Sequence, residues 1–208
     1  QGAVESIDDT SSEVVSLLAN PAREEFRCRG LVVGYVQSGK TANMTAVIAK
    51  AVDAGYNLIV VLAGMTNKLR AQTQSRLEED VVERHRERWQ LYTTSDDDGD
   101  FIVPRNGSFV IPTEGGAQLA VIKKVATRLN AFHNTILRTP PVVRRKLKVL
   151  IIDDECDQAS VNSAPDHYQM TTINEAIRKL IRALPAVSYV GYTATPFANV
   201  FSDPFPHN

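Results

Sequence analysis

The chain has 208 residues, a formal net charge of −1, 43% hydrophobic residues and 23% charged residues. This composition is typical of a packed globular protein, and it excludes a low-complexity, collagen-like or mainly disordered chain. The near-zero charge also excludes a wholly basic nucleic-acid coat, although it leaves room for a local basic groove.

Several targeting and redox signals are missing. No apolar run approaches the roughly 20 residues of a membrane-spanning helix, and no basic region followed by an apolar core marks a signal peptide. The two cysteines, Cys28 and Cys156, are too few for a disulfide scaffold or a four-cysteine zinc site. We therefore expect a reduced, cytoplasmic protein without membrane contact. Because the first residue is Gln1 rather than Met, we also expect a fragment of a longer chain.

Short apolar runs alternate with segments of helical spacing along the chain. The predicted strands cover residues 31–33, 58–62, 91–94, 101–103, 109–111, 119–122, 149–152 and 189–192. The predicted helices cover residues 10–18, 44–55, 67–88, 126–137 and 172–184. A capping box at Thr172–Glu175 opens the last of these helices, and Pro185 ends it. The run from Asp96 to Asp100 is expected to be a solvated acidic loop.

This alternation predicts an α/β fold with a mostly parallel sheet sandwiched by helices. Residues 1–29 form a polar N-terminal extension with a short helix, and residues 30–208 form one domain.

A phosphate-binding loop is predicted between the first strand and the following helix. Residues 34–41 read GYVQSGKT and match G-x-x-x-x-G-K-[ST] at every fixed position. Glycines let backbone N–H groups approach phosphate oxygens, and the helix N-terminus adds unpaired N–H groups and a favourable dipole. Lys40 can reach the β- and γ-phosphates, and the Thr41 hydroxyl can bind Mg²⁺. The predicted ATP–Mg²⁺ site uses Gly34, Gln37, Ser38, Gly39, Lys40 and Thr41.

Carboxylates end the apolar strand at residues 149–157, which read VLIIDDECD. Consecutive acids after a buried strand suggest that a cation faces them, as in P-loop enzymes. We assign Asp154 to the Mg²⁺ shell and Glu155 to activation of the attacking water. A shift by one residue would give the metal role to Asp153 instead, and this alternative stays open. Cys156 is interpreted as a packed residue, because no histidine lies nearby in the sequence to activate it.

A third segment, residues 188–200, reads SYVGYTATPFANV. In this order, GKT, DECD and TAT resemble motifs I, II and III of the superfamily 2 helicase-like ATPases, and residues 63–73 resemble their segment Ia. The resemblance implies a RecA-like ATP-binding lobe in which Thr193 and Thr195 couple the nucleotide state to strand contacts. It also implies that nucleic acid lies against Thr66, Asn67, Lys68 and Arg70.

The exact residues within and around these motifs resemble one particular family, the bacterial Z-one domain family (letter Z, numeral one). The similarity covers about residues 30–201 and is weakest between residues 88 and 118. Members are described as ATP-dependent endonucleases or helicase-like proteins of DNA restriction or phage defence. They are found beside methyltransferases and MORC-type ATPases, which would be candidate partners besides DNA.

Some features of that superfamily are missing from the sequence. Gln1 is the only glutamine before Gln37, so no adenine-reading glutamine motif is found upstream. We expect a second RecA-like lobe, with its arginine fingers, only in the full-length chain, and therefore slow ATP hydrolysis by these residues alone. The E-x-K signature of nucleases is absent, and the four histidines are too scattered for a metal motif: His85, His133, His167 and His207.

Two functions compete on this basis. The first is an ATPase lobe of a DNA-dependent enzyme, and the second is a nucleotide-dependent module that binds a protein partner without moving a strand. A small-molecule kinase is a third, which the Thr-Ala-Thr segment and the lack of a recognisable lid disfavour. A basic cluster could extend the DNA track or could be a solvated loop; it comprises Arg138, Arg144, Arg145, Lys146 and Lys148.

Overall fold

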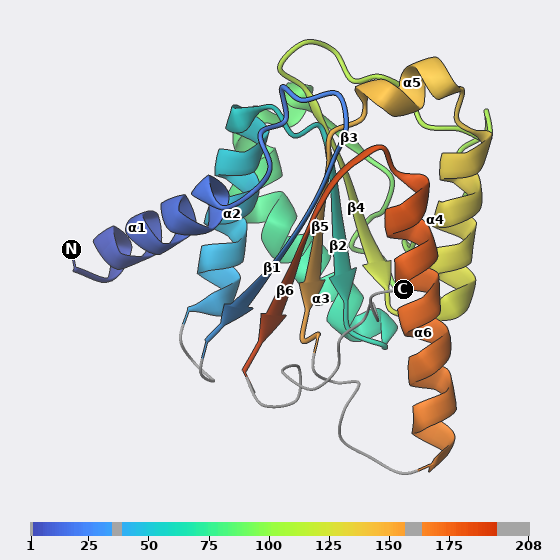
Figure 1. The fold of residues 1–208 in the computed structure, drawn as a ribbon. Helices are drawn as coiled ribbons and strands as arrows, with labels where there is room; N and C mark the ends of the chain where they lie inside the picture. The colour runs from blue at the N-terminus through green and yellow to red at the C-terminus, as the bar shows by residue number, and fades with distance from the viewer. Residues whose placement is uncertain (1, 35–38, 157–163, 195–208) are drawn as a thin grey trace.

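The fold is one parallel sheet between two helical layers (Figure 1). The computed structural model describes residues 2–34, 39–156 and 164–194. Within these residues the sheet has six strands in the order β1-β6-β5-β2-β4-β3, and every neighbouring pair is parallel. The strands are β1 Phe26–Val33, β2 Leu58–Ala63, β3 Trp89–Leu91, β4 Ala117–Lys123, β5 Val149–Asp154 and β6 Ala186–Thr193.

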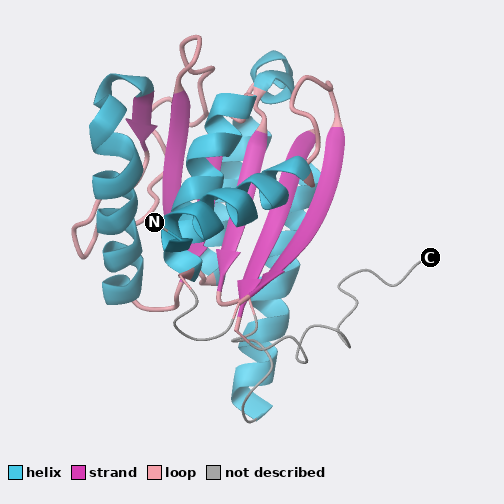
Figure 2. Cartoon of the chain, turned by 90° about the vertical axis from the view of Figure 1, so that its left-hand side faces the viewer, coloured by secondary structure: helices cyan, strands magenta, loops and turns pink. Residues whose placement is uncertain are grey.

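Helices cover both faces of this sheet (Figure 2). Residues of α2 and of the end of α3 pack on one face, and residues of α4 and α6 pack on the other. The helices are α1 Gly2–Ser16, α2 Lys40–Ala54, α3 Asn67–Leu77, α4 Ala126–Arg138, α5 Pro141–Lys146 and α6 Ala164–Ala183. The predicted α/β architecture is therefore confirmed. Within the described residues, no helix combines the length and the apolar character needed to cross a membrane.

The central strands β2 and β5 are buried on both faces, which explains why their sequences are continuous apolar runs. Alternate side chains point to opposite layers. In β5, Val149 and Ile151 join the core beneath α4 and α6, whereas Leu150 and Ile152 join the core beneath α2. This alternation continues into the acidic end of the strand and decides which carboxylate faces which layer.

Strand β1 differs from its prediction. It runs from Phe26 to Val33 rather than over three residues, and Leu31 and Val33 are 46% and 47% exposed. Among the described strands β1 lies at the edge of the sheet, and no described element packs over the side chains of Leu31 and Val33 well enough to bury them. The prediction of a buried strand was wrong here because an apolar run does not reveal the place of its strand in the sheet.

Helix boundaries also differ from the predicted ones. Helix α6 begins at Ala164, so the capping box at Thr172–Glu175 lies inside the helix rather than at its start. Helix α1 likewise begins well before residue 10. The single helix predicted over residues 67–88 becomes α3, a π-helical segment η1 (Glu78–Val82) and a 3₁₀ segment η2 (Glu83–Arg88).

Two predicted strands, residues 101–103 and 109–111, are loop in the structure. Their aromatic residues explain the misleading apolar pattern. Phe101 and Phe109 are fully buried, with ring centroids 4.8 Å and 4.9 Å from that of Phe132 on α4. The loop thus anchors itself in the core through two aromatic side chains and forms no ladder.

Candidate nucleotide-binding site

The carboxyl ends of all six strands lie at one edge of the sheet because every pair is parallel. Open α/β sheets bind ligands at this edge. The residues that follow β1, β2, β5 and β6 therefore meet there. Lys40, Thr66, Asp154 and Thr193 lie far apart in the sequence, and each begins a helix, precedes one or ends a strand at this edge.

The structure describes Gly34, Gly39, Lys40 and Thr41 of the predicted phosphate loop. Gly34 N–H donates to the Thr193 carbonyl at 2.9 Å, which ties the start of the loop to β6. Gly39 precedes α2 with φ 74° and ψ 21°, a left-handed conformation that favours glycine. A Cβ atom there would meet nothing within 4 Å, so backbone conformation rather than space requires the glycine. Lys40 and Thr41 open α2, and Gln37 and Ser38 lie outside the described residues.

Asp154 faces the same layer as α2. It is the register partner of Tyr192, and the Tyr192 hydroxyl reaches Asn43 of α2. Burial raises the pKa of Asp154, and so does Glu155, whereas the charges of Lys124 and Lys40 lower it. Lys40, at the start of α2, thus lies at the edge of the sheet where β5 ends in Asp154. Among the described residues, none donates a hydrogen bond to the Asp154 carboxylate.

Asp153 points to the opposite layer, where both of its oxygens have partners. Lys124 lies 3.1 Å from Oδ1, and the Tyr189 hydroxyl donates to Oδ2 at 2.7 Å. Lys124 is buried and also donates to the backbone oxygens of Asp154 at 2.6 Å and Glu155 at 3.0 Å. Sequence reasoning missed Lys124, although a pair of lysines directly after an apolar strand was a visible signal. The geometry favours Asp154 over Asp153 as the residue that faces a metal ion.

We expect two neighbouring substitutions to have opposite effects on stability. Asp153→Asn should lower the free energy of unfolding by about 3 to 5 kcal/mol, because it leaves the buried Lys124 without its counter-charge. Asp154→Asn should leave that free energy unchanged or raise it, because it removes a partly buried carboxylate that has no donor among the described residues. Urea unfolding of both variants measures this, and equal losses would contradict the division of roles.

The raised pKa of Asp154 also sets the sign of a pH effect. The native state holds this proton to a higher pH than the unfolded chain does, so ionisation of Asp154 costs stability as the pH rises through that interval. The stability advantage of Asp154→Asn over the wild type should therefore be absent in acid and present at neutral pH. Unfolding curves of both proteins across this range test the sign.

Glu155 occupies a strained turn. It is exposed, and its φ of 55° makes it the only non-glycine residue with a positive φ among the described residues. The next residue fixes the turn, since Cys156 N–H donates to the Tyr192 carbonyl at 3.0 Å. Strained backbone of this kind costs about 1 to 3 kcal/mol and is concentrated at functional sites. Cys156 packs against Gly191, where a Cβ atom would lie 2.8 Å from its Sγ.

Thr193 of the third segment is placed unfavourably for direct contact with nucleotide. Thr193 is fully buried. Strand alternation directs its side chain away from the α2 layer, to which its neighbour Tyr192 points. Thr195 lies outside the described residues. Coupling of the nucleotide state through these residues stays a prediction.

The residues predicted to touch nucleic acid have different environments. Thr66 caps α3 by accepting from Leu69 N–H at 3.3 Å, and Asn67 Oδ1 accepts from Lys123 at 2.6 Å. Arg70 is fully buried and donates to the carbonyls of Thr94 at 2.8 Å and Asp96 at 2.6 Å. The prediction that Arg70 contacts nucleic acid is therefore wrong, because its guanidinium group holds the loop after β3 and does not reach solvent.

A stability measurement can check this new role of Arg70. Arg70→Met should lower the free energy of unfolding by about 3 kcal/mol or more, because the two hydrogen bonds from its buried guanidinium group to loop carbonyls are lost. Arg76→Met, which removes an exposed arginine of the same helix, is the matched control and should change it little. If both variants were equally stable, the guanidinium group would not be holding the loop.

The basic cluster lies at the wrong edge of the sheet to extend a track beside the nucleotide. Arg138 ends α4, and three further cations lie on α5 (Arg144, Arg145 and Lys146). Helix α5 directly precedes β5, so it lies at the amino edge, opposite the strand arrowheads of Figure 1. Lys148 donates to the carbonyls of Arg23 at 2.6 Å and Glu24 at 3.0 Å, which gives it a structural role.

The acidic loop is solvated only in part. Asp96, Asp97 and Asp98 are exposed as predicted, whereas Asp100 is buried. Asp100 accepts from Phe101 N–H at 2.7 Å and lies 3.5 Å from Arg128. In the part of the chain that the structure describes, no three His, Cys, Asp or Glu residues cluster as metal ligands. A Mg²⁺ site of one carboxylate, one hydroxyl and phosphate oxygens needs no such cluster, so Thr41 and Asp154 fit this ion.

Comparisons with known proteins leave the family open. No known protein family matches the chain, and no curated protein does. Two solved structures that resemble it are an ATPase domain and one described as "The Structure Of A DnaB-Like Replicative Helicase And Its Interactions With Primase". They are 11% and 13% identical over 88% and 89% of this chain, with TM-scores of 0.39 and 0.38. The chain spans 62% and 42% of their lengths. TM-scores this low carry no argument about function.

Proposed function

We propose that this chain is the ATP-binding and ATP-hydrolysing lobe of a helicase-like, DNA-dependent enzyme. One observation supports this most. The parallel sheet places Lys40, at the N-terminus of the helix after the glycine loop, at the same edge of the sheet as Asp154, which faces the layer of that helix. A nucleotide–Mg²⁺ complex requires a helix N-terminus with a lysine and, opposite it, a carboxylate. Among the described residues, none donates a hydrogen bond to the Asp154 carboxylate.

Each residue has a defined part in this proposal. The N-terminus of α2 and Lys40 would bind the phosphates, and Thr41 and Asp154 would hold Mg²⁺. The bound ion would neutralise the charge that develops on the transferred phosphoryl group. Glu155 stands on an exposed turn beside Asp154, where its carboxylate could accept a proton from the attacking water. Lys124 and Tyr189 position this acidic end through Asp153 and the backbone.

The finer assignment depends on the resemblance to the superfamily 2 ATPases and to the Z-one domain family. We include in the proposal an endonuclease of restriction or phage defence, with a second RecA-like lobe in the full-length chain. MORC-type ATPases or methyltransferases are the proposed protein partners. DNA would lie at the carboxyl edge near Thr66, Asn67 and the exposed Lys68. Such contact is chiefly electrostatic, so salt should weaken it.

ATP turnover with and without single- and double-stranded DNA tests the proposal. We expect Mg²⁺-dependent ATP binding and slow hydrolysis by these 208 residues, because the arginine fingers of such ATPases come from a second lobe. Vigorous DNA-stimulated turnover by these residues alone would contradict the expected dependence on a second lobe. Absence of ATP binding would contradict the nucleotide site itself.

A further inference from the structure

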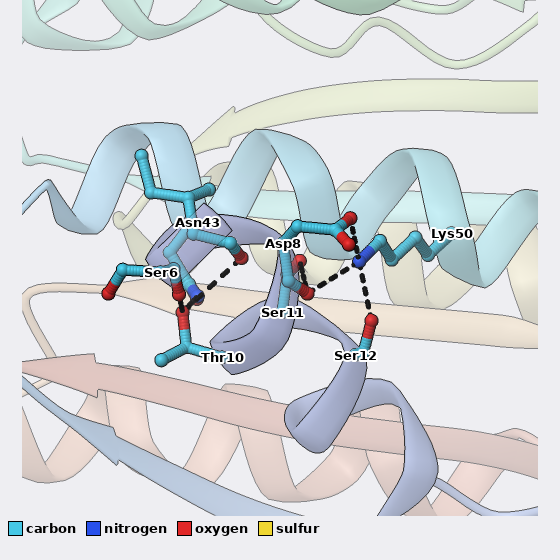
Figure 3. A network of polar contacts seen from close by, with 8 residues as sticks. Ser6, Asp8, Thr10, Ser11, Ser12, Asn43 and Lys50 are labelled. Atoms are coloured by element: carbon cyan, nitrogen blue, oxygen red, sulfur yellow. Dashed lines mark hydrogen bonds and ion pairs between the residues drawn. The ribbon is translucent and has the colours of Figure 1, made fainter. Parts of the chain in front are cut away.

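Polar contacts dock the N-terminal helix α1 onto the phosphate-loop helix α2 (Figure 3). Lys50 of α2 forms an ion pair with Asp8 at 2.7 Å and donates to Ser12 Oγ at 2.6 Å. Exposed ion pairs contribute about 0 to 1 kcal/mol. In α1, over residues 6–16, only Ser11 is buried. Val14 and Val15 of α1 also pack, partly buried, against the core beneath α2, so α1 is held by apolar as well as polar contacts.

A second contact joins α1 to the nucleotide site itself. Asn43 lies in the first turn of α2, three residues after Lys40. Its amide nitrogen donates to Thr10 Oγ1 at 3.0 Å, and its amide oxygen accepts from the Tyr192 hydroxyl at 3.0 Å. One amide thus connects α1, α2 and β6.

The hydrogen bonds of Thr10 agree with this orientation of the Asn43 amide. Thr10 Oγ1 donates to the Ser6 carbonyl at 2.7 Å, as Figure 3 shows, so its lone pairs are free to accept from the Asn43 amide nitrogen. That contact turns the amide oxygen toward Tyr192, whose hydroxyl is the donor. Three hydrogen bonds therefore run in series from β6 to the backbone of α1, and such series strengthen their members.

Tyr192 also links this series of hydrogen bonds to Asp154 and Glu155. It is 1% exposed and is the register partner of Asp154. Its carbonyl accepts from Cys156 N–H, which holds the turn of Glu155. The Tyr192 hydroxyl thus contacts α2, which carries Lys40, and the Tyr192 carbonyl contacts the turn that follows Asp154.

We propose that Asn43 is a positioning residue that sets the start of α2 against Asp154, and that Thr10 of α1 orients its amide for this task. The proposal deepens the proposed function and rests on it. Lys40 and Thr41 lie on α2 and Asp154 on β5. A bound Mg²⁺ held by Thr41 and Asp154 would therefore depend on how α2 sits against β5, and Asn43 fixes α2 to Tyr192 of β6, the strand paired with β5. Coupling of this kind is reciprocal, so a bound Mg²⁺–nucleotide also stabilises the docked α1.

The test measures the Mg²⁺ gain, which is the ratio of the nucleotide Kd without Mg²⁺ to that with Mg²⁺. The probe is a non-hydrolysable ATP analogue. Thr10→Val and Tyr192→Phe should each reduce the Mg²⁺ gain about fivefold, the effect of one lost neutral hydrogen bond. Their Mg²⁺-free Kd should change less, because Lys40 stays in place. A purely structural role would weaken both Kd values together.

Two further variants serve as controls. Ser12→Ala also removes a hydroxyl contact between α1 and α2 but does not touch Asn43, so the Mg²⁺ gain should stay at the wild-type value. Thr10→Ser keeps the hydroxyl and should restore the gain that Thr10→Val loses. Thermal unfolding of every variant confirms that the comparison is made on folded protein.

The outcomes separate this inference from the proposed function. If the wild type binds no nucleotide with or without Mg²⁺, both are wrong. If it binds with a clear Mg²⁺ gain, but Thr10→Val and Ser12→Ala have equal effects, only the positioning role of Asn43 is overturned. A selective loss in Thr10→Val and Tyr192→Phe, with rescue by Thr10→Ser, supports it.

Discussion

Lys40→Ala should abolish nucleotide binding, with a rise in the ATP Kd of about 100-fold or more. In the proposed site the lysine would supply a point charge to the β- and γ-phosphates, and loss of hydrogen bonds to charged groups costs about 1.5 to 3 kcal/mol each. Titration calorimetry or fluorescence of a labelled ATP analogue measures the change. The unfolding transition should hardly move, because Lys40 is not part of the buried core.

Lys68→Ala is the matched control for this substitution. Lys68 is exposed at the same edge of the sheet, so its removal changes the net charge equally. ATP affinity should stay within about twofold in this variant, since surface charges act weakly over a distance in salt. An unchanged ATP affinity in Lys40→Ala, or an equal loss in Lys68→Ala, would contradict the phosphate-loop assignment.

Glu155→Gln should stop turnover and keep ATP binding. A positioned general base contributes about 10² to 10⁴ in rate, so hydrolysis should fall by at least about 100-fold. Glutamine has nearly the same shape and cannot take the proton, so the ATP Kd should change by less than about threefold. Single-turnover hydrolysis and equilibrium binding on the same preparation measure both quantities. The variant should accumulate in its ATP-bound form.

This variant also separates the two functions that the sequence left open. A module that uses ATP only to order a surface for a protein partner needs no general base, so Glu155→Gln would then leave its behaviour intact. Glu175→Gln, on the exposed side of α6, makes the same chemical change away from the site and should leave turnover unchanged. Equal turnover in the wild type and Glu155→Gln would refute the catalytic role.

Local sequence patterns predicted several elements well, because the burial of those elements is reflected in neighbouring residues of the same element. The run Leu58–Leu62 is apolar because β2 is buried on both faces, and the helical spacing from Met44 to Ala51 matches the buried side of α2. Gly55 ends α2 in the left-handed conformation that its position predicted. In contrast, the capping box at Thr172–Glu175 is a valid local signal that the longer helix α6 overrides.

The sequence by itself determined where the predicted phosphate loop and the acidic strand end lie along the chain. Their residue types are set by chemistry that acts over a few positions, so GYVQSGKT and IIDDE are recognisable without a fold. Parallel strands separated by helices then follow from the pattern, because such strands are apolar throughout.

Only the tertiary structure decided which side chains meet. Strand order and the two faces of the sheet are long-range properties. They direct the Asp154 side chain to the α2 layer and the Asp153 side chain to the opposite layer, where Lys124 and Tyr189 contact it. The same long-range packing buries Arg70 and places α5 at the amino edge. It also brings Thr10 to Asn43, 33 positions away, and Asn43 to Tyr192, 149 positions away. No local pattern encodes these contacts, since each depends on how several strands and helices pack together.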